Sequence, residues 1–335
     1  MIKKILLWLV GLVVVLAVVG LLLPRQAHVE RTIRIDRPAS LVFATVNSYQ
    51  RFSAWSPWAE YDPNMQQSIE GPRSGVGAKM SWSGNSKVGS GNQEIVAAVA
   101  NQSVTSNLNF TGMSQSKATF TLGADDSTGT KVTWSLDTDM GAGPIGRYVG
   151  LFMDRMVGGD FARGLAKLKT VVEALPNTDI AGFAVEAVNA QAEPILTITK
   201  TTSTDTAAIS KAYAEAYAQI SKYMTKHKLQ QHGAPQGIDR AMTDKSYSFD
   251  AAMPIDRSDA VSEGDVKARQ SYAGKALKTV HVGSYDALEK TYAKMAAYFA
   301  ANGYEGNGAP YSKYIDDPAT TPAEKLRTEM YWPVK

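Results

Sequence analysis

Two stretches in the second half of the chain repeat each other: residues 212–235 read AYAEAYAQISKYMTKHKLQQHGAP, and residues 287–310 read ALEKTYAKMAAYFAANGYEGNGAP. The matched residues lie 75 positions apart: Tyr217 and Tyr292, Tyr223 and Tyr298, and the Gly-Ala-Pro triplets 233–235 and 308–310. Such agreement at a fixed spacing indicates an internal duplication. Each copy predicts a helix followed by a turn.

The duplication continues beyond the turns at an offset of 79, where DAAMPI at 250–255 corresponds to EMYWPV at 329–334. Strand-like runs at 195–201 and 275–282 precede the two helices. Each copy therefore reads as strand, helix, turn, strand and strand. Two copies are too few for a solenoid, so we expect a closed, pseudo-twofold α+β domain with a groove between sheet and helices.

Upstream, residues 27–175 alternate strand-like runs with turn residues and end in one long helical pattern. The strands are expected at 28–36, 66–70, 78–82, 92–100, 104–110, 116–122 and 130–137. The helix is expected over 145–175, where Gly158-Gly159 indicates a bend or the close approach of another backbone. This α+β order is typical of a helix-grip fold, in which an antiparallel sheet wraps the last helix around an apolar cavity.

The run from Ile5 to Leu23 carries no charge and is long enough to cross a bilayer. A cleaved signal peptide is the alternative, but its apolar region is normally shorter, and Pro24-Arg25-Gln26 does not resemble a cleavage site. We therefore expect a single-pass N-terminal anchor with its N-terminus inside. The bulk of the chain then lies on the outer side, periplasmic or extracytoplasmic in a bacterial cell.

The composition excludes several classes of site. The 335 residues include 35 Lys plus Arg and 32 Asp plus Glu, a net charge of +3 that is too balanced for a phosphate-binding face, so we expect no nucleic acid partner. The absence of cysteine removes disulfides, thiolate catalysis and thiolate metal sites. With only four scattered histidines, we expect neither a metal nor a cofactor.

Within residues 27–175, a series of motifs carries a resemblance: Trp55-Ser56-Pro57-Trp58, Asp62-Pro63, Gly71-Pro72, Gly75-Val76-Gly77, Trp82-Ser83-Gly84 and Gly91. Together they resemble the SRPBCC superfamily, with its START-like helix-grip fold, in its polyketide cyclase/dehydrase-like branch. The resemblance implies a cavity for lipids, polyketides or other apolar small molecules. Trp55, Trp58, Trp82 and Trp134 are the candidate lining residues, with ordinary core packing as the alternative.

The duplicated half carries a second set of motifs: Gly283-Ser284-Tyr285, Gly303-Tyr304, Gly308-Ala309-Pro310, Tyr314, Asp317-Pro318 and the run 328–334. It resembles the GyrI-like family, the effector-binding domain of AraC-type and related multidrug-sensing regulators. The resemblance implies that Glu329 sits in an aromatic groove and meets cationic or polar ligands. Some relatives are reported as small-molecule hydrolases, in which this glutamate would be catalytic. An acidic residue that relatives often carry near Ser312 is missing here.

On a strand, Glu329 and Tyr331 share one face, while Trp332 lies on the other. A carboxylate against aromatic walls loses hydration, which raises its pKa, and an organic cation would supply the missing counter-charge. Tyr331, Tyr285, Trp332 and Tyr314 are the further candidate ligand contacts. Glu329 as a general base is one alternative, and a solvated strand residue is the other.

These observations predict an anchor at 1–26, a helix-grip domain at 27–175, a linker at 176–194 and a GyrI-like domain at 195–335. The expected function is a membrane-anchored binding protein for hydrophobic or amphipathic small molecules, cationic ones included, acting as sensor, carrier or scavenger. The alternatives are a hydrolase that uses Glu329, a cyclase-like activity in the first domain, or an adaptor for an unidentified envelope protein.

Overall fold

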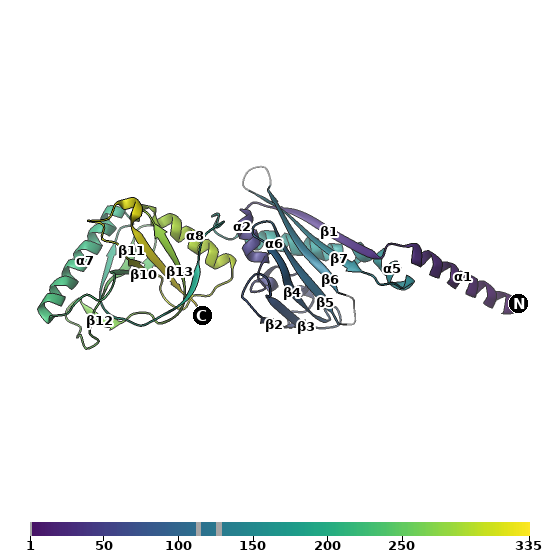
Figure 1. Cartoon of the computed structure of the whole chain (residues 1–335), viewed down its shortest axis with the longest axis horizontal. Helices are drawn as coiled ribbons and strands as arrows, with labels where there is room; N and C mark the ends of the chain where they lie inside the picture. Colours follow the sequence, from purple (N-terminus) through teal and green to yellow (C-terminus); the bar gives the residue numbers. More distant parts are fainter. Residues whose placement is uncertain (1, 112–114, 125–128) are drawn as a thin grey trace. The chain divides into compact units, whose positions relative to one another are not determined.

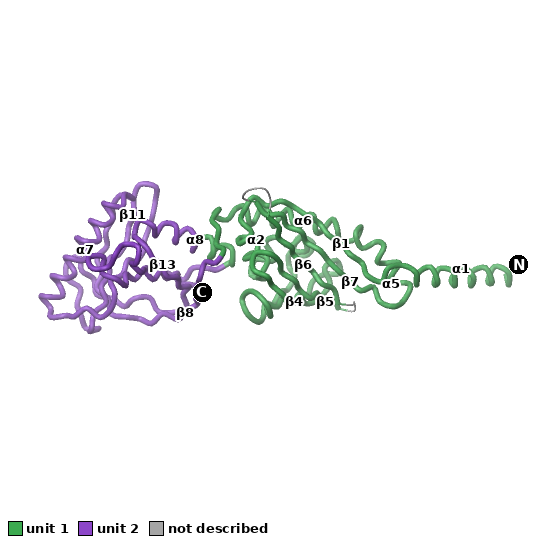
Figure 2. Tube along the Cα trace, turned by 45° about the horizontal axis from the view of Figure 1, so that its top comes forward, with its two compact units in different colours: residues 1–181, 296–303 green, residues 182–295, 304–335 purple. Residues whose placement is uncertain are grey.

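The computed structural model describes residues 2–111, 115–124 and 129–335. The chain forms two compact units, which Figure 2 colours green and purple. Unit 1 comprises residues 1–181 and 296–303, and unit 2 comprises 182–295 and 304–335. Each unit is α+β with an antiparallel sheet of its own (Figure 1).

Unit 1 begins with helix α1 (Ile2–Leu22), which carries Lys3 and Lys4 near its start and only uncharged residues after them. Its side chains are almost all exposed. Among the described residues, it is the one helix long and apolar enough to cross a membrane. At about 1.5 Å per residue it spans roughly 30 Å, the thickness of a bilayer core.

The sheet of unit 1 has seven antiparallel strands in the order β1-β7-β6-β5-β4-β3-β2. They are β1 (Gln26–Ile35), β2 (Gln66–Glu70), β3 (Lys79–Ser83), β4 (Ser90–Val99), β5 (Ser103–Phe110), β6 (Ser116–Ala124) and β7 (Thr130–Asp139). All seven predicted strands are confirmed, with ends that shift by no more than two residues. Alternating burial along β6 and β7 shows that one face of the sheet points inward.

The helices of unit 1 cover that inward face. They are α2 (Ala39–Val46), α3 (Phe52–Trp55), α4 (Trp58–Tyr61), α5 (Pro144–Gly150) and α6 (Met153–Glu173). Phe161, Leu165, Leu168 and Val172 recur at helical spacing on the buried side of α6. The long helix predicted from the sequence is thus confirmed in its position after the sheet.

The predicted bend at Gly158-Gly159 is wrong: α6 runs through both glycines, and the helical segment breaks earlier, at 151–152. Gly158 instead makes room for a side chain. A Cβ there would lie 2.1 Å from Nη2 of Arg31. The Arg31 guanidinium passes over this position and binds Asp154 one turn earlier in α6, with Nη1 2.7 Å from Oδ1.

Unit 2 contains an eight-stranded antiparallel sheet in the order β12-β9-β11-β10-β14-β15-β13-β8. The strands are β8 (Glu186–Ala190), β9 (Pro194–Thr202), β10 (Gln236–Met242), β11 (Tyr247–Pro254), β12 (Lys267–Gln270), β13 (Gly274–Val282), β14 (Tyr311–Tyr314) and β15 (Arg327–Pro333). The helices are α7 (Thr206–His227) and α8 (Leu288–Ala301), of which the residues from Ala296 onward count with unit 1. Strand β8, paired with β13, falls within the segment that the sequence assigned to a linker.

The sheet order displays the duplication directly. The first copy is β9, α7, β10 and β11, the second is β13, α8, β14 and β15, and the central strands β10 and β14 pair antiparallel. Residues in corresponding positions also share backbone geometry. Lys228 after α7 has φ 54°, and Gly303 after α8 has φ 63°. The left-handed ends of both helices begin the turns that the repeated Gly-Ala-Pro triplets complete.

Candidate functional site

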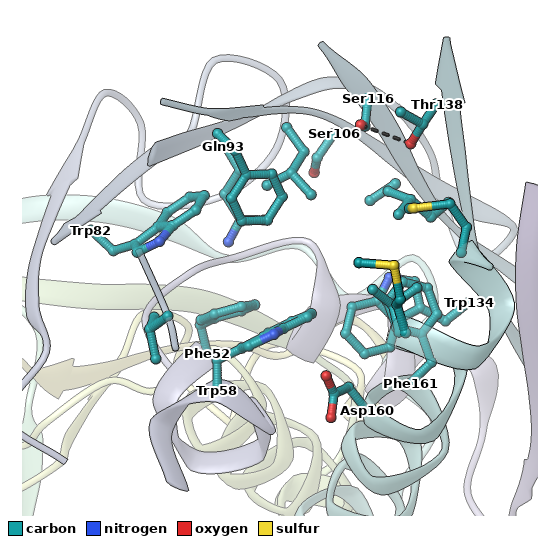
Figure 3. Close-up of a pocket in the computed structure, with 18 of the residues that line it drawn as sticks. Phe52, Trp58, Trp82, Gln93, Ser106, Ser116, Trp134, Thr138, Asp160 and Phe161 are labelled. Atoms are coloured by element: carbon teal, nitrogen blue, oxygen red, sulfur yellow. Dashed lines mark hydrogen bonds between the residues drawn. The ribbon is translucent and has the colours of Figure 1, made fainter. Parts of the chain in front are cut away.

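A cavity of about 550 Å³ lies in unit 1 between the inward face of the sheet and the helices (Figure 3). Antiparallel register aligns its sheet wall, because paired residues point to the same side. Thus Trp82 lies beside Gly91, Ser106 beside Ala118, and Phe120 beside Trp134, each pair on two adjacent strands. Helices α3, α4, α5 and α6 contribute the opposite wall.

The floor of this cavity is a packed group of aromatic rings. Trp134 stacks on Phe161 of α6 with ring centroids 4.1 Å apart, and on Phe120 at 5.0 Å. Trp55 meets both Trp134 and Phe120 edge-on at 5.7 Å and is only 2% exposed. Offset and edge-to-face packing of this kind stabilises large rings in one arrangement, so the cavity wall is rigid and preformed.

The few polar groups in the cavity wall are mostly already paired. The hydroxyls of Tyr49 and Ser106 lie 2.9 Å apart, and Thr138 donates to Ser116 at the same distance. Burial raises the pKa of Tyr49 to about 12, so its hydroxyl stays neutral. Gln93 adds a buried amide on the sheet side (Figure 3). Such a wall suits an apolar molecule that carries one or two hydrogen-bonding groups.

Asp160, which lines the cavity together with Asp139, lies beside its aromatic floor (Figure 3). It accepts a hydrogen bond from Tyr61 Oη at 2.8 Å and forms an ion pair with Arg163. The hydrogen bond to Asp160, more than burial, raises the pKa of Tyr61. Because the carboxylate is neutralised by its own neighbour, it is not poised as a free base.

In unit 2, Glu329 lies on the sheet face that points away from α8. Ser312 of β14 binds Tyr292 of α8, with the two hydroxyls 2.9 Å apart, so the alternate residue Lys313 and its register partner Glu329 face the other way. Lys278 Nζ lies 2.6 Å from Oε1 of Glu329, and Tyr331 donates to Oε2 at 2.7 Å. The carboxylate side chain is 24% exposed.

These contacts determine the ionisation of Glu329. Burial opposes the charged form, but hydrogen bonds from Lys278 and Tyr331 and the positive charges of Lys278 and Lys313 outweigh it, so the pKa of Glu329 lies below its ordinary value. The raised pKa expected from the sequence is therefore wrong. The counter-charge that a ligand was expected to supply is already present as Lys278.

Comparison with protein families assigns both units. Residues 26–173 match the family described as polyketide cyclase/dehydrase and lipid transport, and residues 183–335 match the GyrI-like small-molecule binding domain. The chain is a fusion of these two domains. A comparison with curated protein sequences found no match.

Several solved structures are similar to parts of the chain. An EcmrR–DNA complex is 15% identical with a TM-score of 0.42, over 57% of this chain and 72% of that one. A hydrolase from Listeria innocua is 16% identical with a TM-score of 0.34, over 45% and 91%. Truncated norcoclaurine synthase from Thalictrum flavum is 10% identical with a TM-score of 0.36, over 44% and 94%.

In the polyketide cyclase domain, the four candidate tryptophans Trp55, Trp58, Trp82 and Trp134 line the cavity. Gly91 of the family motif explains the position of Trp82: a Cβ on Gly91 would lie 2.6 Å from Cζ2 of that indole. The candidate list from the sequence omitted Phe161 and Gln93. Helical spacing of apolar residues gave a signal for Phe161, but nothing local pointed to Gln93.

In the GyrI-like domain, the structure separates the predicted group. Glu329 and Tyr331 lie together on the face away from the helices, where Tyr331 stacks on Tyr311 at 4.7 Å and both rings are buried. Tyr314 lies on the helix side with Tyr285, their ring centroids 5.4 Å apart. Trp332, opposite Leu277, also alternates away from Glu329. The predicted residues therefore belong to two opposite faces of one sheet.

A smaller cavity of about 230 Å³ opens on the same face as Glu329. Tyr272, Tyr311, Gln236 and Arg269 belong to its lining, whereas Glu329 does not. Asp250, the repeat mate of Glu329, is 1% exposed and bound by Arg240, Arg269 and Thr199, which agrees with a structural role. Among the described residues, no group of three His, Asp or Glu side chains is placed to hold a metal ion.

No motif in the sequence indicated a buried carboxylate on the helix side of the GyrI-like sheet. Asp239 accepts a hydrogen bond from Tyr247, and the tyrosines Tyr213 and Tyr314 belong to the same cluster. Burial raises the pKa of Asp239 even though the Tyr247 hydroxyl opposes this. Asp239 lies on the same side of β10 as Gly237, whose register partner Ser312 binds Tyr292 of α8, because alternate residues of a strand face the same way.

Proposed function

We propose that this protein is a membrane-anchored binding protein for lipophilic small molecules, and that the cavity of the polyketide cyclase domain is its principal ligand site. The observation that carries the proposal is the rigid aromatic cavity of about 550 Å³, a volume in the range of small-molecule sites. Helix α1, long and apolar enough to cross a membrane, supports the proposed anchor. In this proposal the bulk of the chain lies on the outer side of the membrane. Such a protein would act as a sensor, carrier or scavenger.

Ligand binding is favoured over catalysis because the titratable groups are paired internally. Asp160 is held by Arg163 and Glu329 by Lys278, and the lowered pKa of Glu329 makes that carboxylate a weak general base. For the GyrI-like domain we propose a second, polar binding face. Both signs of charge beside the Tyr311–Tyr331 ring pair suit a polar or zwitterionic aromatic ligand.

The proposal is tested by filling the cavity. Ala118 is a buried, small side chain of the β6 wall, so Ala118→Phe places a ring inside the cavity. We expect the detergent-solubilised wild type to bind a dansyl-labelled fatty acid with energy transfer from tryptophan, and Ala118→Phe to weaken the affinity about tenfold.

Thr121→Phe provides the matched control, because Thr121 lies on the exposed side of the same strand. It should bind like the wild type. Native mass spectrometry of the extracted protein should also find a retained apolar molecule that Ala118→Phe loses. Equal affinity in all three proteins, or no probe binding by the wild type, would overturn the proposal.

A further inference from the structure

Helix α5 and the start of α6 carry an exposed apolar patch that the proposed binding function does not explain. Its members are Ile145, Leu151, Phe152 and Met156, between 56% and 79% exposed. Four large, exposed apolar side chains lie within twelve residues, and such a cluster of exposed apolar surface normally marks an interaction site. We call these four residues the α5–α6 patch.

The α5–α6 patch adjoins the end of α1 within unit 1. Tyr148 of α5 donates to the backbone carbonyl of Leu16 at 2.9 Å, and Arg147 donates to that of Leu23 at 3.0 Å. A Cβ on Gly20 would lie 2.5 Å from Cβ of Pro144, so this glycine permits the close approach. Leu16 lies six residues before Leu22, the last residue of α1, which corresponds to about 9 Å along the helix. The Tyr148 side chain therefore contacts α1 within its apolar run.

Charged groups gather at this junction, just beyond the apolar run of α1, which ends at Leu22. Arg147 satisfies carbonyls at the C-terminus of α1, where the helix dipole favours a positive charge. Arg25 and Asp139 form an ion pair just beyond, with Nη2 2.6 Å from Oδ2. These charged groups beyond the end of α1 and the apolar patch beside α1 follow the order of headgroups and acyl chains in a bilayer leaflet.

The α5–α6 segment contributes both to the cavity wall and to the exposed surface. Val149 of α5 and Met156 of α6 line the cavity and are also 40% and 60% exposed. Met153 and Val157 line the cavity as well. The cavity wall, the α5–α6 patch and the contacts with α1 therefore come from the same short segment of the chain.

We propose that the α5–α6 patch inserts into the outer leaflet beside α1 and forms a portal through which lipophilic ligands enter the cavity directly from the bilayer. The occupant of the patch is the acyl region of the lipid. Any partner that covers the patch must also accommodate the exposed apolar surface of α1 beside it, and a bilayer meets both requirements. This inference rests on the proposed binding function and adds the route of entry.

Depth of insertion can be measured directly, because the chain contains no cysteine. Leu151→Cys labelled with an NBD fluorophore, in the full chain in phosphatidylcholine vesicles with phosphatidylglycerol, should be quenched by lipids that carry a spin label on the acyl chain. Val99→Cys is the control, since Val99 is half exposed at the far end of β4. Equal quenching at both positions would overturn the insertion.

The route of entry is tested with Leu151→Glu and Phe152→Glu, two residues that do not line the cavity. Loading of the dansyl-labelled fatty acid from the vesicles should become about tenfold slower in the double variant, because the apolar surface that would insert into the lipid is lost. Affinity for the same probe in detergent should match the wild type. Val99→Glu should leave both quantities unchanged.

The two proposals fail in different ways. No probe binding in detergent would overturn the cavity as a ligand site. Binding in detergent, combined with loading from vesicles at the wild-type rate in the double variant, would overturn the portal alone. A change in oligomeric state of the double variant without a change in loading would assign the patch to a second copy of the chain and also overturn the portal.

Discussion

Glu329 shows how neighbouring side chains limit what a carboxylate can do. Strands β13 and β14 flank β15 and supply Lys278 and Lys313, so the acid that the sequence singled out is surrounded by positive charge. An organic cation at Glu329 would have to compete with Lys278. The residue is thus better suited to hold a polar ligand together with its lysines than to bind a lone cation.

Removal of Lys278 should raise the pKa of Glu329. Lys278→Met leaves a partly buried carboxylate without its closest cation, and we expect a loss of about 1–2 kcal/mol in unfolding free energy at pH 7. Because the folded pKa of Glu329 is lowered, this stabilisation is present above the unfolded pKa, about 4.3, and is lost as the pH falls through the folded value. Urea unfolding at several pH values measures it.

The exposed Lys275 of the same strand gives the control, and Lys275→Met should change the unfolding free energy by less than about 0.5 kcal/mol. A difference between Lys278→Met and the wild type that stays constant from pH 7 to pH 3 would contradict the assigned ion pair. Binding of tetraphenylphosphonium should strengthen in Lys278→Met if Glu329 accepts cations.

At the scale of elements, the strands of the polyketide cyclase domain shape the cavity through residues of opposite size. Gly91 on β4 lies opposite Trp82 on β3, and the indole occupies the space that a side chain would take. Trp82 in turn meets Phe110 of β5 edge-on at 5.4 Å. A single glycine therefore positions an aromatic contact between three strands.

Gly91→Ala tests this arrangement. The added methyl would lie 2.3 Å from the carbonyl oxygen of Asn109 and 2.6 Å from Trp82, so we expect a loss of about 1–3 kcal/mol and weaker binding of the dansyl probe. Gly123→Ala in β6 meets nothing closer than 4.0 Å and should be neutral or slightly stabilising. Similar stability of the two variants in thermal unfolding would contradict the packing described.

At the scale of the whole molecule, each unit has a hydrophobic core of its own. Leu168 of α6 is fully buried in the core of unit 1, and Ile220 of α7 is fully buried in that of unit 2 together with Phe249. The cores draw on different elements and different parts of the chain. Each domain should therefore respond by itself to a change in its own core.

Leu168→Ala and Ile220→Ala should each cost about 2–5 kcal/mol, because each leaves a cavity in close-packed surroundings. Hydrogen exchange of the full-length protein should show faster exchange only in residues 26–173 for the first variant and only in 183–335 for the second. Faster exchange in both ranges from either variant would show that the cores unfold as one.

Much of this architecture follows from the sequence alone. Alternation and turn residues predicted all seven strands of the first sheet, and the 75-residue repeat predicted the pseudo-twofold domain, because these signals reside in neighbouring residues or in the comparison of one stretch with another. The tryptophans of the cavity wall were candidates for another reason, because aromatic rings suit the cavity that the family resemblance implies. The strands and the repeat depend on local periodicity, which the sequence carries directly.

Tertiary structure alone decided the rest. The pairing of Lys278 with Glu329 and the packing of Tyr148 on Leu16 join residues far apart in the chain, as does the separation of Tyr314 from Glu329 onto opposite faces of the sheet. Strand register and helix packing set these distances, and a shift of one residue would exchange the two faces. The charge state of the site and the position of the cavity opening are therefore properties of the fold.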